Sequence, residues 1–502
     1  MSTTTTTTTP TAEGRSPQAP VRLPERRLLI GGEWRDAVSG RTFDTIDPAT
    51  EQVITSVAEP DEADIDLAVR AARTAFDDGP WPTMRAATRA RLLHRLAALV
   101  EEHQEELVAL ESLDAGKPLA AIRRQDMPTV LDCLEYYAGW CDKITGDVVP
   151  VTPDALTYVN RVPVGVVAGI VPWNFPLMNA VWKIAPALAC GCTIVMKPAA
   201  ETPLSALRFG ELAMEAGLPP GVLNILPGPG PGPGTALVTH PGIDKITFTG
   251  SPAVGKLIME RAAVNVPRIT LELGGKSPNV VFDDADLDAA AKAAASGVFF
   301  NSGQVCSAGT RVLVHERVHD RFVDALVARA RSLRVGDPRA EGTYMGPLIS
   351  QKQLDRVLGY VRTGVDEGAT LVSGGERLER AGYFVPPTVF ADVDRSMVIA
   401  REEIFGPVVS VLRFTDEDEA IAMANDSPYS LAAALWTEDV RRAHTVAARL
   451  RAGTVWVNTY GQTDNRLPWG GLGGDSGVGR DLGSSALENF TDRRTVWVNL
   501  KR

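Results

Sequence analysis

Cys306 is the residue whose type and surroundings most favour covalent chemistry. It follows an alanine-rich, helix-like stretch, precedes a strand-like one, and has small neighbours that leave room for a substrate. A thiolate is a strong nucleophile, and its pKa falls near positive charge or a helix N-terminus. The pattern therefore indicates a nucleophile in such surroundings, although a buried structural cysteine has the same local sequence.

Two further residues suit reactions at a carbonyl group. Glu272 stands between two leucines at the end of a predicted strand, where desolvation raises a carboxyl pKa and favours a general base. The alternative for Glu272 is an ion pair with Lys276. Asn174 lies in a loop between two prolines, and a rigidly held amide suits an oxyanion. Its alternative is an ordinary turn asparagine.

Residues 248–255 follow a predicted strand and open a predicted helix. Gly250 and Gly255 let backbone N–H groups approach a phosphate at the helix N-terminus. This spacing is not the G-x-G-x-x-G pattern. The proline- and glycine-rich run 227–234 does not supply that pattern either, because it lacks a start suited to a helix, and we expect an exposed turn there.

These residues need elements that hold them together. From residue 164 onward short apolar runs alternate with helical stretches, which predicts an α/β fold of two doubly wound parallel sheets. Such sheets bind nucleotides at the carboxyl ends of their strands. A hairpin is expected from residue 28, and helices over 61–77 and 89–115. The predicted strands are 164–171, 193–197, 222–226, 245–249, 268–273, 279–282, 310–315, 408–414 and 454–458.

The composition excludes several classes of protein. The chain has 502 residues and a net charge of −11, so we expect two to four domains and no attraction to nucleic acid or to an anionic membrane surface. No apolar run approaches the length of a membrane span. The five cysteines are few and odd in number, and none has the spacing of a metal site, so we expect no metal and a cytoplasmic location.

Seven segments together resemble the aldehyde dehydrogenase superfamily in their order and spacing, and the resemblance extends from about residue 28 to the end. Residues 136–144 resemble its hydrolytic, broad-specificity branch. The resemblance implies an NAD(P)-dependent enzyme that oxidises an aldehyde to a carboxylic acid. The segments are 172–176, 196–199, 248–251, 272–278, 303–306, 402–408 and 468–471.

The resemblance also assigns roles to residues. Cys306 would attack the aldehyde carbon, Asn174 and the Cys306 N–H would hold the oxyanion, and Glu272 would activate the water that hydrolyses the thioester. Lys183 would belong to a nearby proton relay. The implied cofactor-binding residues are Val171, Trp173, Lys197, Gly230, Phe248, Gly250, Ser251, Leu273, Gln353, Glu403 and Phe405. The implied substrate-binding residues are Phe175, Trp182, Val305, Ser307 and Trp469.

The resemblance further implies a domain plan and a homo-oligomer, either a dimer or a tetramer, that uses a small β arm. Residues 1–21 are predicted to be a disordered tail. The cofactor-binding, Rossmann-like domain is predicted over 22–144 and 163–274, and the catalytic domain over 275–474. The arm is predicted over 145–162, with a return segment and oligomerisation strand over 475–502.

Three departures from the family pattern affect the predictions. Ala200 stands where the family often has a ribose-binding glutamate, so NADP becomes possible beside NAD, and we expect the adjacent Glu201 to point elsewhere. Asp481 replaces a relay glutamate and is one methylene shorter, which would slow deacylation. The loop 472–475, expected at the substrate mouth, has one residue more than usual.

Other activities remain as alternatives. A CoA-acylating semialdehyde dehydrogenase would pass the same thioester to a thiol, but such enzymes lack the glutamate base. A catalytically silent binding or structural member would lack the cysteine, glutamate or asparagine. A phosphorylating enzyme would need anion-binding residues that are not identified. The aromatic residues among the substrate contacts favour medium aliphatic or aromatic aldehydes.

Overall fold

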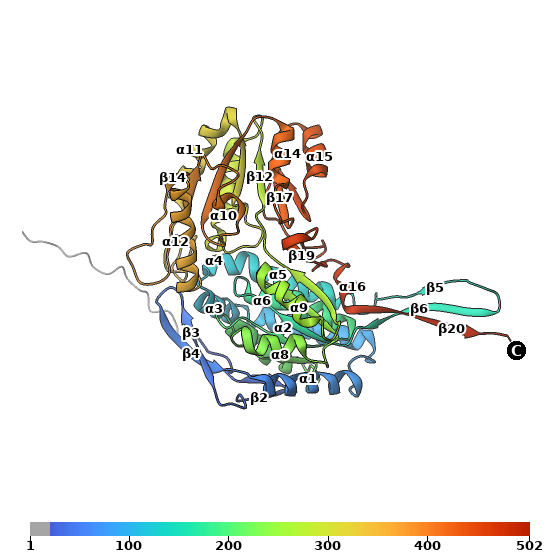
Figure 1. The fold of residues 1–502 in the computed structure, drawn as a ribbon. Coiled ribbons are helices and arrows are strands. Elements are labelled where there is room, and N and C mark those ends of the chain that lie inside the picture. Colours follow the sequence, from blue (N-terminus) through green and yellow to red (C-terminus); the bar gives the residue numbers. More distant parts are fainter. Residues whose placement is uncertain (1–20, 502) are drawn as a thin grey trace, which may run out of the picture.

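The computed structural model describes residues 21–501, so residues 1–20 of the predicted tail over 1–21 lie outside the described residues. Two lobes lie one above the other, and a narrow arm extends from the lower lobe (Figure 1). Each lobe contains a largely parallel sheet covered by helices, which confirms the predicted α/β class. No helix within residues 21–501 is long and apolar enough to cross a bilayer.

The sheet of the lower lobe has eight strands. Its central five strands are parallel, and antiparallel strands complete both edges. The predicted hairpin from residue 28 forms one edge. In spatial order the strands are β19 (Gly477–Val478), β11 (Arg268–Glu272), β10 (Lys245–Thr249), β7 (Val166–Ile170), β8 (Thr193–Lys197), β9 (Leu223–Ile225), β1 (Leu28–Ile30) and β2 (Glu33–Arg35).

Helices cover both faces of this sheet, and two of them differ from expectation. The predicted helix 89–115 is two helices broken at His103, and the break lets α2 pack on α5 while α3 packs on α7. Helix α8 begins at Pro231 inside the run predicted as a turn, because proline's fixed φ suits a first helical turn. The helices are α1 (Glu62–Asp77), α2 (Ala86–Glu102), α3 (Gln104–Ala115), α4 (Leu119–Ala121), α5 (Met127–Ala138), α6 (Pro176–Cys190), α7 (Leu204–Glu215), α8 (Pro231–Thr239) and α9 (Pro252–Ala262).

The sheet of the upper lobe has seven strands, all parallel except β14. In spatial order they are β14 (Thr370–Ser373), β15 (Thr388–Ala391), β16 (Val408–Phe414), β13 (Arg311–His315), β12 (Pro278–Val281), β17 (Ala432–Trp436) and β18 (Thr454–Val457). The helices of this lobe are α10 (Leu287–Phe299), α11 (His319–Ser332), α12 (Gln351–Asp366), α13 (Val398–Arg401), α14 (Glu417–Asn425) and α15 (Val440–Arg449).

The strands are apolar because both faces of each sheet are buried. In β7, Val166 and Ala168 enter one hydrophobic cluster and Val167 enters another. In β12, Val280 and Val281 divide between two clusters in the same way. Strands buried on both sides carry continuous apolar runs rather than an alternating pattern. This explains why the predicted strands agree closely with the structure.

The arm is a three-stranded antiparallel sheet in the order β20 (Thr491–Asn499), β6 (Ala155–Pro163) and β5 (Asp147–Val148). A separate hairpin pairs β3 (Thr42–Asp47) with β4 (Gln52–Ala58), and α16 (Ala486–Phe490) leads into β20. After the second sheet, the chain returns to the first through β19. The predicted domain boundaries themselves stay a prediction.

Candidate active site

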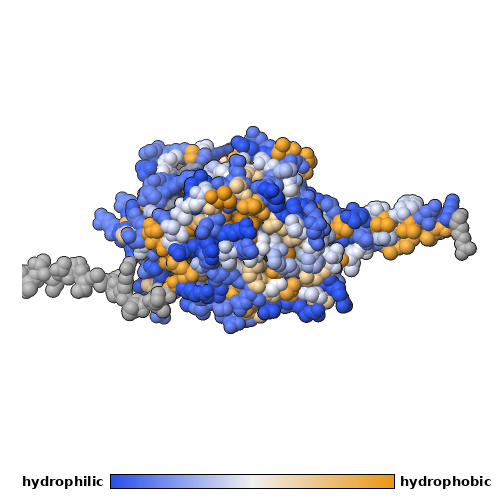
Figure 2. All heavy atoms as spheres, turned by 90° about the horizontal axis from the view of Figure 1, so that it is seen from below, coloured by the Kyte–Doolittle hydropathy of each residue, from blue (hydrophilic) through white to orange (hydrophobic). Residues whose placement is uncertain are grey.

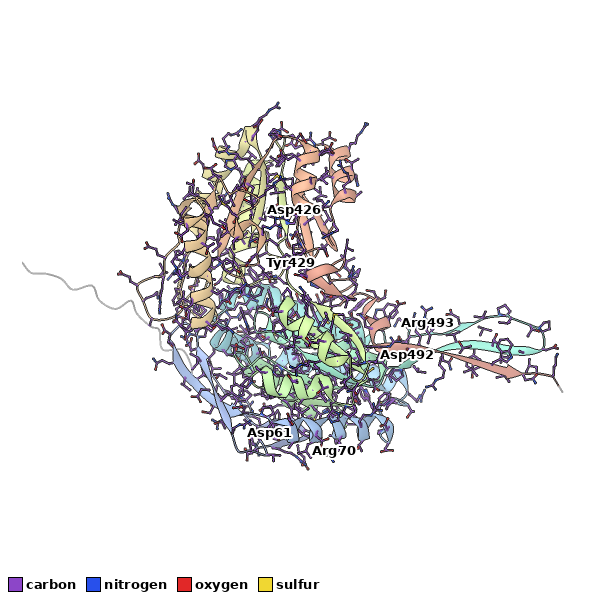
Figure 3. The ribbon with its side chains drawn as sticks, viewed as in Figure 1. Asp61, Arg70, Asp426, Tyr429, Asp492 and Arg493 are labelled. Atoms are coloured by element: carbon purple, nitrogen blue, oxygen red, sulfur yellow. The ribbon has the colours of Figure 1, made fainter. Side chains whose placement is uncertain are left out.

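A cavity of about 930 Å³ lies between the two lobes and has the size of a ligand site. Tyr429, labelled between the lobes in Figure 3, is one of its lining residues. Cys306, Glu272 and Asn174 also line it, although they come from distant parts of the chain. The fold therefore brings the three predicted catalytic residues to one cavity.

Cys306 follows a loop with an unusual backbone. Asn301, Ser302 and Gly303 have φ values of 50°, 56° and 73°, and such left-handed conformations are costly for residues other than glycine. The Ser302 hydroxyl donates to the Gly346 carbonyl at 2.8 Å. The Ile349 N–H donates to Gln304 Oε1 at 2.9 Å. These bonds offset the strain and hold the cysteine at the cavity wall.

The electrostatic surroundings of Cys306 differ from expectation. The side chain is partly exposed, yet its pKa is raised to about 12, first by burial of the sulfur and then by the Glu403 and Glu272 carboxyls. In the protein alone, burial and negative charge therefore take the place of the positive charge or helix N-terminus that would lower a thiol pKa. The cysteine rests as a neutral thiol, and attack on a carbonyl requires its deprotonation during the reaction.

Asn174 is tied to the cysteine loop from both sides. Its Nδ2 donates to the Gln304 carbonyl at 2.8 Å, and Asn301 Nδ2 donates to the Asn174 carbonyl at 2.8 Å. An amide nitrogen carries two hydrogens, so the bond to Gln304 leaves one for another acceptor. The arrangement is compatible with an oxyanion donor, a role that stays a prediction.

Glu272 is almost completely buried, and neither of its carboxyl oxygens has a hydrogen-bond partner among the described residues. Burial raises its pKa well above the usual value, the Asp481 carboxyl adds to this, and Lys183 opposes it. Lys276 likewise has no partner there, and burial lowers its pKa to about 7. The alternative of a Glu272–Lys276 ion pair is therefore not observed.

Lys183 lies behind the cavity rather than on its wall. It is fully buried in α6 and forms an ion pair with Asp481, which does line the cavity. The shorter aspartate thus still reaches the lysine. The relay role of Lys183 stays a prediction.

Helix α6 is fixed at its start by a carboxylate from another helix. Phe175 at its N-cap provides no side-chain hydrogen bond, but the Leu177 N–H donates to Glu111 Oε1 of α3 at 2.6 Å. Helix α7 is held similarly, since the Leu204 N–H donates to Asp114 Oδ2 at 3.1 Å. Free N–H groups at a helix start need such acceptors, so α3 sets the position of the helix that carries Lys183.

Most residues predicted for the cofactor line the cavity. The N-terminus of α9 faces it, where Ser251 is the N-cap and accepts from the Val254 N–H at 3.4 Å. This N-terminus presents backbone donors and a positive dipole end to a phosphate. The predicted cofactor residues that line the cavity are Trp173, Gly250, Ser251, Leu273, Gln353, Glu403 and Phe405.

The other predicted cofactor residues are not among the lining residues. Val171 and Lys197 are joined by a backbone hydrogen bond at the end of β8, and Lys197 Nζ donates to the Gly228 carbonyl at 2.5 Å. Burial lowers the pKa of Lys197 to about 8, which the Glu201 carboxylate opposes. Gly230 is the N-cap of α8, and Phe248 precedes the α9 loop at the end of β10.

The residues predicted to bind the substrate also line the cavity, and most of them are aromatic. Phe175, Trp182, Val305, Ser307 and Trp469, the predicted substrate residues, all line it. The rings of Trp182 and Trp469 meet edge to face with centroids 6.3 Å apart. Lining residues that the sequence did not indicate include Phe300, Tyr460, Thr463, Gln125, Thr129 and Ser296. They come from three separate stretches of the chain, at or just after the end of α10, around the start of α5, and in the loop after β18, and they share no motif.

Two expectations about departures from the family pattern are wrong. Glu201 does not point elsewhere but lines the cavity. Within the described residues, none of 472–475 lines it, because this segment lies against α9, where Asp475 pairs with Lys256 at 2.7 Å. The extra residue is therefore accommodated outside the cavity.

Comparison with known proteins gives a consistent result. The model of the aldehyde dehydrogenase family matches residues 34–496. Human retinal dehydrogenase 2 is 49% identical over 97% of this chain and 94% of its own length. Human mitochondrial aldehyde dehydrogenase is 48% identical over 96% and 94%.

Solved structures agree with this assignment. The NAD+ complex of an aldehyde dehydrogenase from Bacillus cereus superposes with a TM-score of 0.93 and 51% identity, covering 95% of this chain and 97% of that one. An indole-3-acetaldehyde dehydrogenase from P. syringae, in complex with NAD+ and IAA, has a TM-score of 0.93 at 45% identity, with coverages of 95% and 97%.

Proposed function

The chain belongs to the aldehyde dehydrogenase family, and we propose that it oxidises an aldehyde to a carboxylic acid with NAD through a thioester on Cys306. The observation that carries this proposal is the single cavity that Cys306, Glu272 and Asn174 line together. A nucleophile, a base and an amide donor at one carbonyl are the groups that acyl chemistry requires.

The residues of the cavity fit the cofactor. The α9 N-terminus and Ser251 suit a pyrophosphate, while the Glu403 carboxylate and the Phe405 ring lie on the wall toward Cys306 and Trp173. When bound, NAD supplies the acceptor for the hydride that the substrate carbon loses. Lys197, buried near Gly228, would bind a ribose hydroxyl.

The protein residues act in sequence on the substrate. The Cys306 thiol gives up its proton to solvent, the resulting thiolate sulfur bonds to the aldehyde carbon, and the oxygen gains a negative charge that the Asn174 amide would stabilise. After the carbon is oxidised, Glu272 takes a proton from water, the water oxygen bonds to the thioester carbon, and the carbon–sulfur bond breaks. Because burial raises its pKa, the ionised Glu272 carboxylate is a stronger base than an ordinary glutamate carboxylate.

Hydrolysis is proposed over transfer to CoA because Glu272 faces the same cavity as Cys306. The test is an assay of NADH and of the acyl product with an aldehyde, with and without CoA. Carboxylic acid without CoA is the expected product. Strict dependence on CoA would overturn the proposal, and no NADH under either condition would favour a silent member.

The proposed substrates are medium aliphatic or aromatic aldehydes, because several aromatic side chains line the cavity. Apolar walls bind apolar side chains and discriminate only moderately between lengths. Initial rates with short, long, aromatic and amino-substituted aldehydes test this, and a preference for the amino-substituted members would contradict it.

The proposed assembly is a dimer or tetramer of this chain, formed in part through the arm. Figure 2 shows hydrophobic residues exposed along the arm. Val148, Trp497 and Leu500 are among them, with exposures of 72%, 58% and 55%. A protruding sheet with a long apolar surface needs a partner to cover it.

A further inference from the structure

Tyr460, in the loop after β18, lines the cavity and also bonds to the main chain next to the nucleophile. Its hydroxyl donates to the Ser307 carbonyl at 2.6 Å. Burial raises the pKa of Tyr460, so the hydroxyl keeps its proton at neutral pH and acts as a donor. The proposed reaction assigns no role to this bond.

The ring of Tyr460 packs directly against the backbone at two glycines. A Cβ at Gly297 of α10 would lie 2.6 Å from Cδ1 of the ring, and a Cβ at Gly309 would lie 2.8 Å from Cζ. The ring of Trp456 packs on that of Tyr460, with centroids 4.8 Å apart, and its Nε1 donates to the Gln462 carbonyl at 3.0 Å. The contacts therefore fix both the ring and the loop that carries it.

Cys306 lies in a tight turn of the main chain. The Ala308 N–H donates to the Val305 carbonyl at 3.0 Å, which places Cys306 and Ser307 at the two central positions of the turn. This bond closes the turn without using the Ser307 carbonyl. Ser307 is 7% exposed, and a buried carbonyl needs a donor. The Tyr460 hydroxyl is that donor.

A side chain thus holds the main chain on each side of Cys306. Two residues before it, Asn174 Nδ2 donates to the Gln304 carbonyl at 2.8 Å. One residue after it, the Tyr460 hydroxyl holds the Ser307 carbonyl. The directions of the Cys306 side chain and of its N–H follow from the backbone dihedral angles of the turn. The two hydrogen bonds at the ends of the segment therefore constrain both directions.

We propose that Tyr460 is a positioning residue for the attack on the aldehyde: through the Ser307 carbonyl, its hydroxyl fixes the turn that directs the Cys306 sulfur and N–H. This inference rests on the proposed function. Without the hydroxyl, the buried carbonyl lacks its donor and the turn is free to move toward another. Because a misplacement of about 1 Å can cost about a hundredfold in rate, a smaller shift of the sulfur is expected to cost about tenfold.

The test is the first turnover of NADH in the full-length enzyme, followed by stopped-flow absorbance at saturating NAD and varied aldehyde. Tyr460→Phe keeps the ring and removes only the hydroxyl. Its maximal first-turnover rate is expected to fall about tenfold, while the half-saturating aldehyde concentration and the Kd of NAD stay within about twofold. An unchanged maximal rate, or a weaker affinity for the aldehyde as the only effect, would overturn the inference.

The matched control is Tyr137→Phe, which removes a buried hydroxyl with the same kind of partner. The Tyr137 hydroxyl donates to the Gly483 carbonyl at 3.0 Å, and Tyr137 does not line the cavity. Urea unfolding should show similar losses of stability in the two variants, and Tyr137→Phe should keep the first-turnover rate. An equal loss of rate in both would show a general loosening of the fold and contradict the positioning role.

A second variant moves Tyr460 without changing it. Gly297→Ala places a methyl group 2.6 Å from Cδ1 of the ring, so the ring must shift, although alanine suits helix α10 better than glycine. The first-turnover rate is expected to fall here too. The double variant with Tyr460→Phe should lose less than the product of the two single losses, because both changes act on one hydrogen bond.

Gly297→Ala also decides the question if Tyr460→Phe does not fold. An unchanged rate in Gly297→Ala, or fully multiplicative losses in the double variant, would count against the inference. A failure of the proposed function gives a different result, since the unmodified enzyme would then form no NADH at all.

Discussion

Cys306 and the loop before it show how a single nucleophile is prepared. Three consecutive left-handed residues are held by side-chain bonds to the Gly346 carbonyl and the Ile349 N–H. The thiol itself rests neutral because burial and two carboxyls raise its pKa. Position, rather than a lowered pKa, is what the protein alone gives this cysteine.

Cys306→Ala is expected to reduce NADH formation to below about one-thousandth of the unmodified rate, because no other cysteine lines the cavity in the described residues. The measurement is absorbance of NADH under saturating aldehyde. Cys141→Ala, at a buried thiol remote from the cavity, is the control and should retain the activity. Substantial NADH formation by Cys306→Ala would exclude it as the nucleophile.

Glu272→Gln is expected to give one rapid equivalent of NADH per active site and then a slow phase, because the thioester forms but water is no longer activated. In the unmodified enzyme the steady rate should fall as pH drops through the raised pKa of Glu272, since the protonated acid accepts no proton. Stopped-flow absorbance measures both. A steady rate unchanged in the variant would show that another group is the base.

Glu201 is the residue at which the cofactor preference is tested. Its carboxylate lines the cavity and acts on Lys197, so it is expected to repel the additional phosphate of NADP. Glu201→Ala should raise kcat/KM for NADP relative to NAD by about fivefold to tenfold, given about 1 kcal/mol for two charges at about 4 Å in water. Glu215→Ala, on the exposed side of α7, is the control, and an unchanged ratio in Glu201→Ala contradicts this role.

Helices contribute through their ends and through one irregular turn. The start of α9 faces the cavity, and the start of α6 is capped by Glu111 from α3. A π-helical turn over Ile122–Asp126 directs Gln125 to the cavity. The last residue of this turn, Asp126, forms an ion pair with the buried Lys117. The Lys117 ammonium lies 3.6 Å from the centroid of the Phe175 ring, which lines the cavity. Such turns are common at functional sites. The buried ion pair of Lys117 and Asp126 therefore packs behind the Phe175 part of the cavity wall.

Glu111→Ala is expected to destabilise the protein by about 1–3 kcal/mol, because the Leu177 N–H and the Ser205 hydroxyl lose their acceptor. Denaturant unfolding measures the change, and kcat should fall with it if α6 moves. The control is Glu105→Ala on the same helix, whose ion pair with Arg123 is exposed and is expected to matter by less than about 1 kcal/mol. Equal effects of the two changes would contradict the capping role.

The molecule as a whole consists of two lobes, one above the other, and an arm that extends from the lower lobe (Figure 1). The cavity is lined by residues of both lobes. The arm joins β6 from the middle of the chain to β20 at its end over nine registered pairs, from Thr491 with Pro163 to Asn499 with Ala155. Its apolar residues remain exposed in the single chain. We therefore expect these apolar residues to be covered by another copy of the chain in the proposed dimer or tetramer.

Trp497→Glu is expected to shift the protein toward smaller species, because a charge replaces an apolar side chain at the proposed contact. Light scattering after size-exclusion chromatography measures the mass. Val440→Glu, at a residue 73% exposed on α15 and far from the arm, is the control and should keep the mass of the unmodified protein. A monomeric unmodified protein would contradict the proposed assembly.

The sequence by itself determined the α/β class, most strand positions and the family. Strands buried on both faces must be apolar, so runs such as 193–197 and 245–249 are recognisable without contacts. The motifs around Cys306 and Glu272 likewise carry their residue types in fixed spacing. The sequence determined the ends of helices less well. The break between α2 and α3 at His103 depends on the different helices against which α2 and α3 pack.

The tertiary structure alone decided the electrostatics and the far walls of the cavity. Whether Glu201 lines the cavity, whether Lys276 pairs with Glu272, and whether the Cys306 pKa rises or falls all depend on groups distant in the chain. A pKa is set by burial and by charges a few ångströms away, and local sequence contains neither quantity.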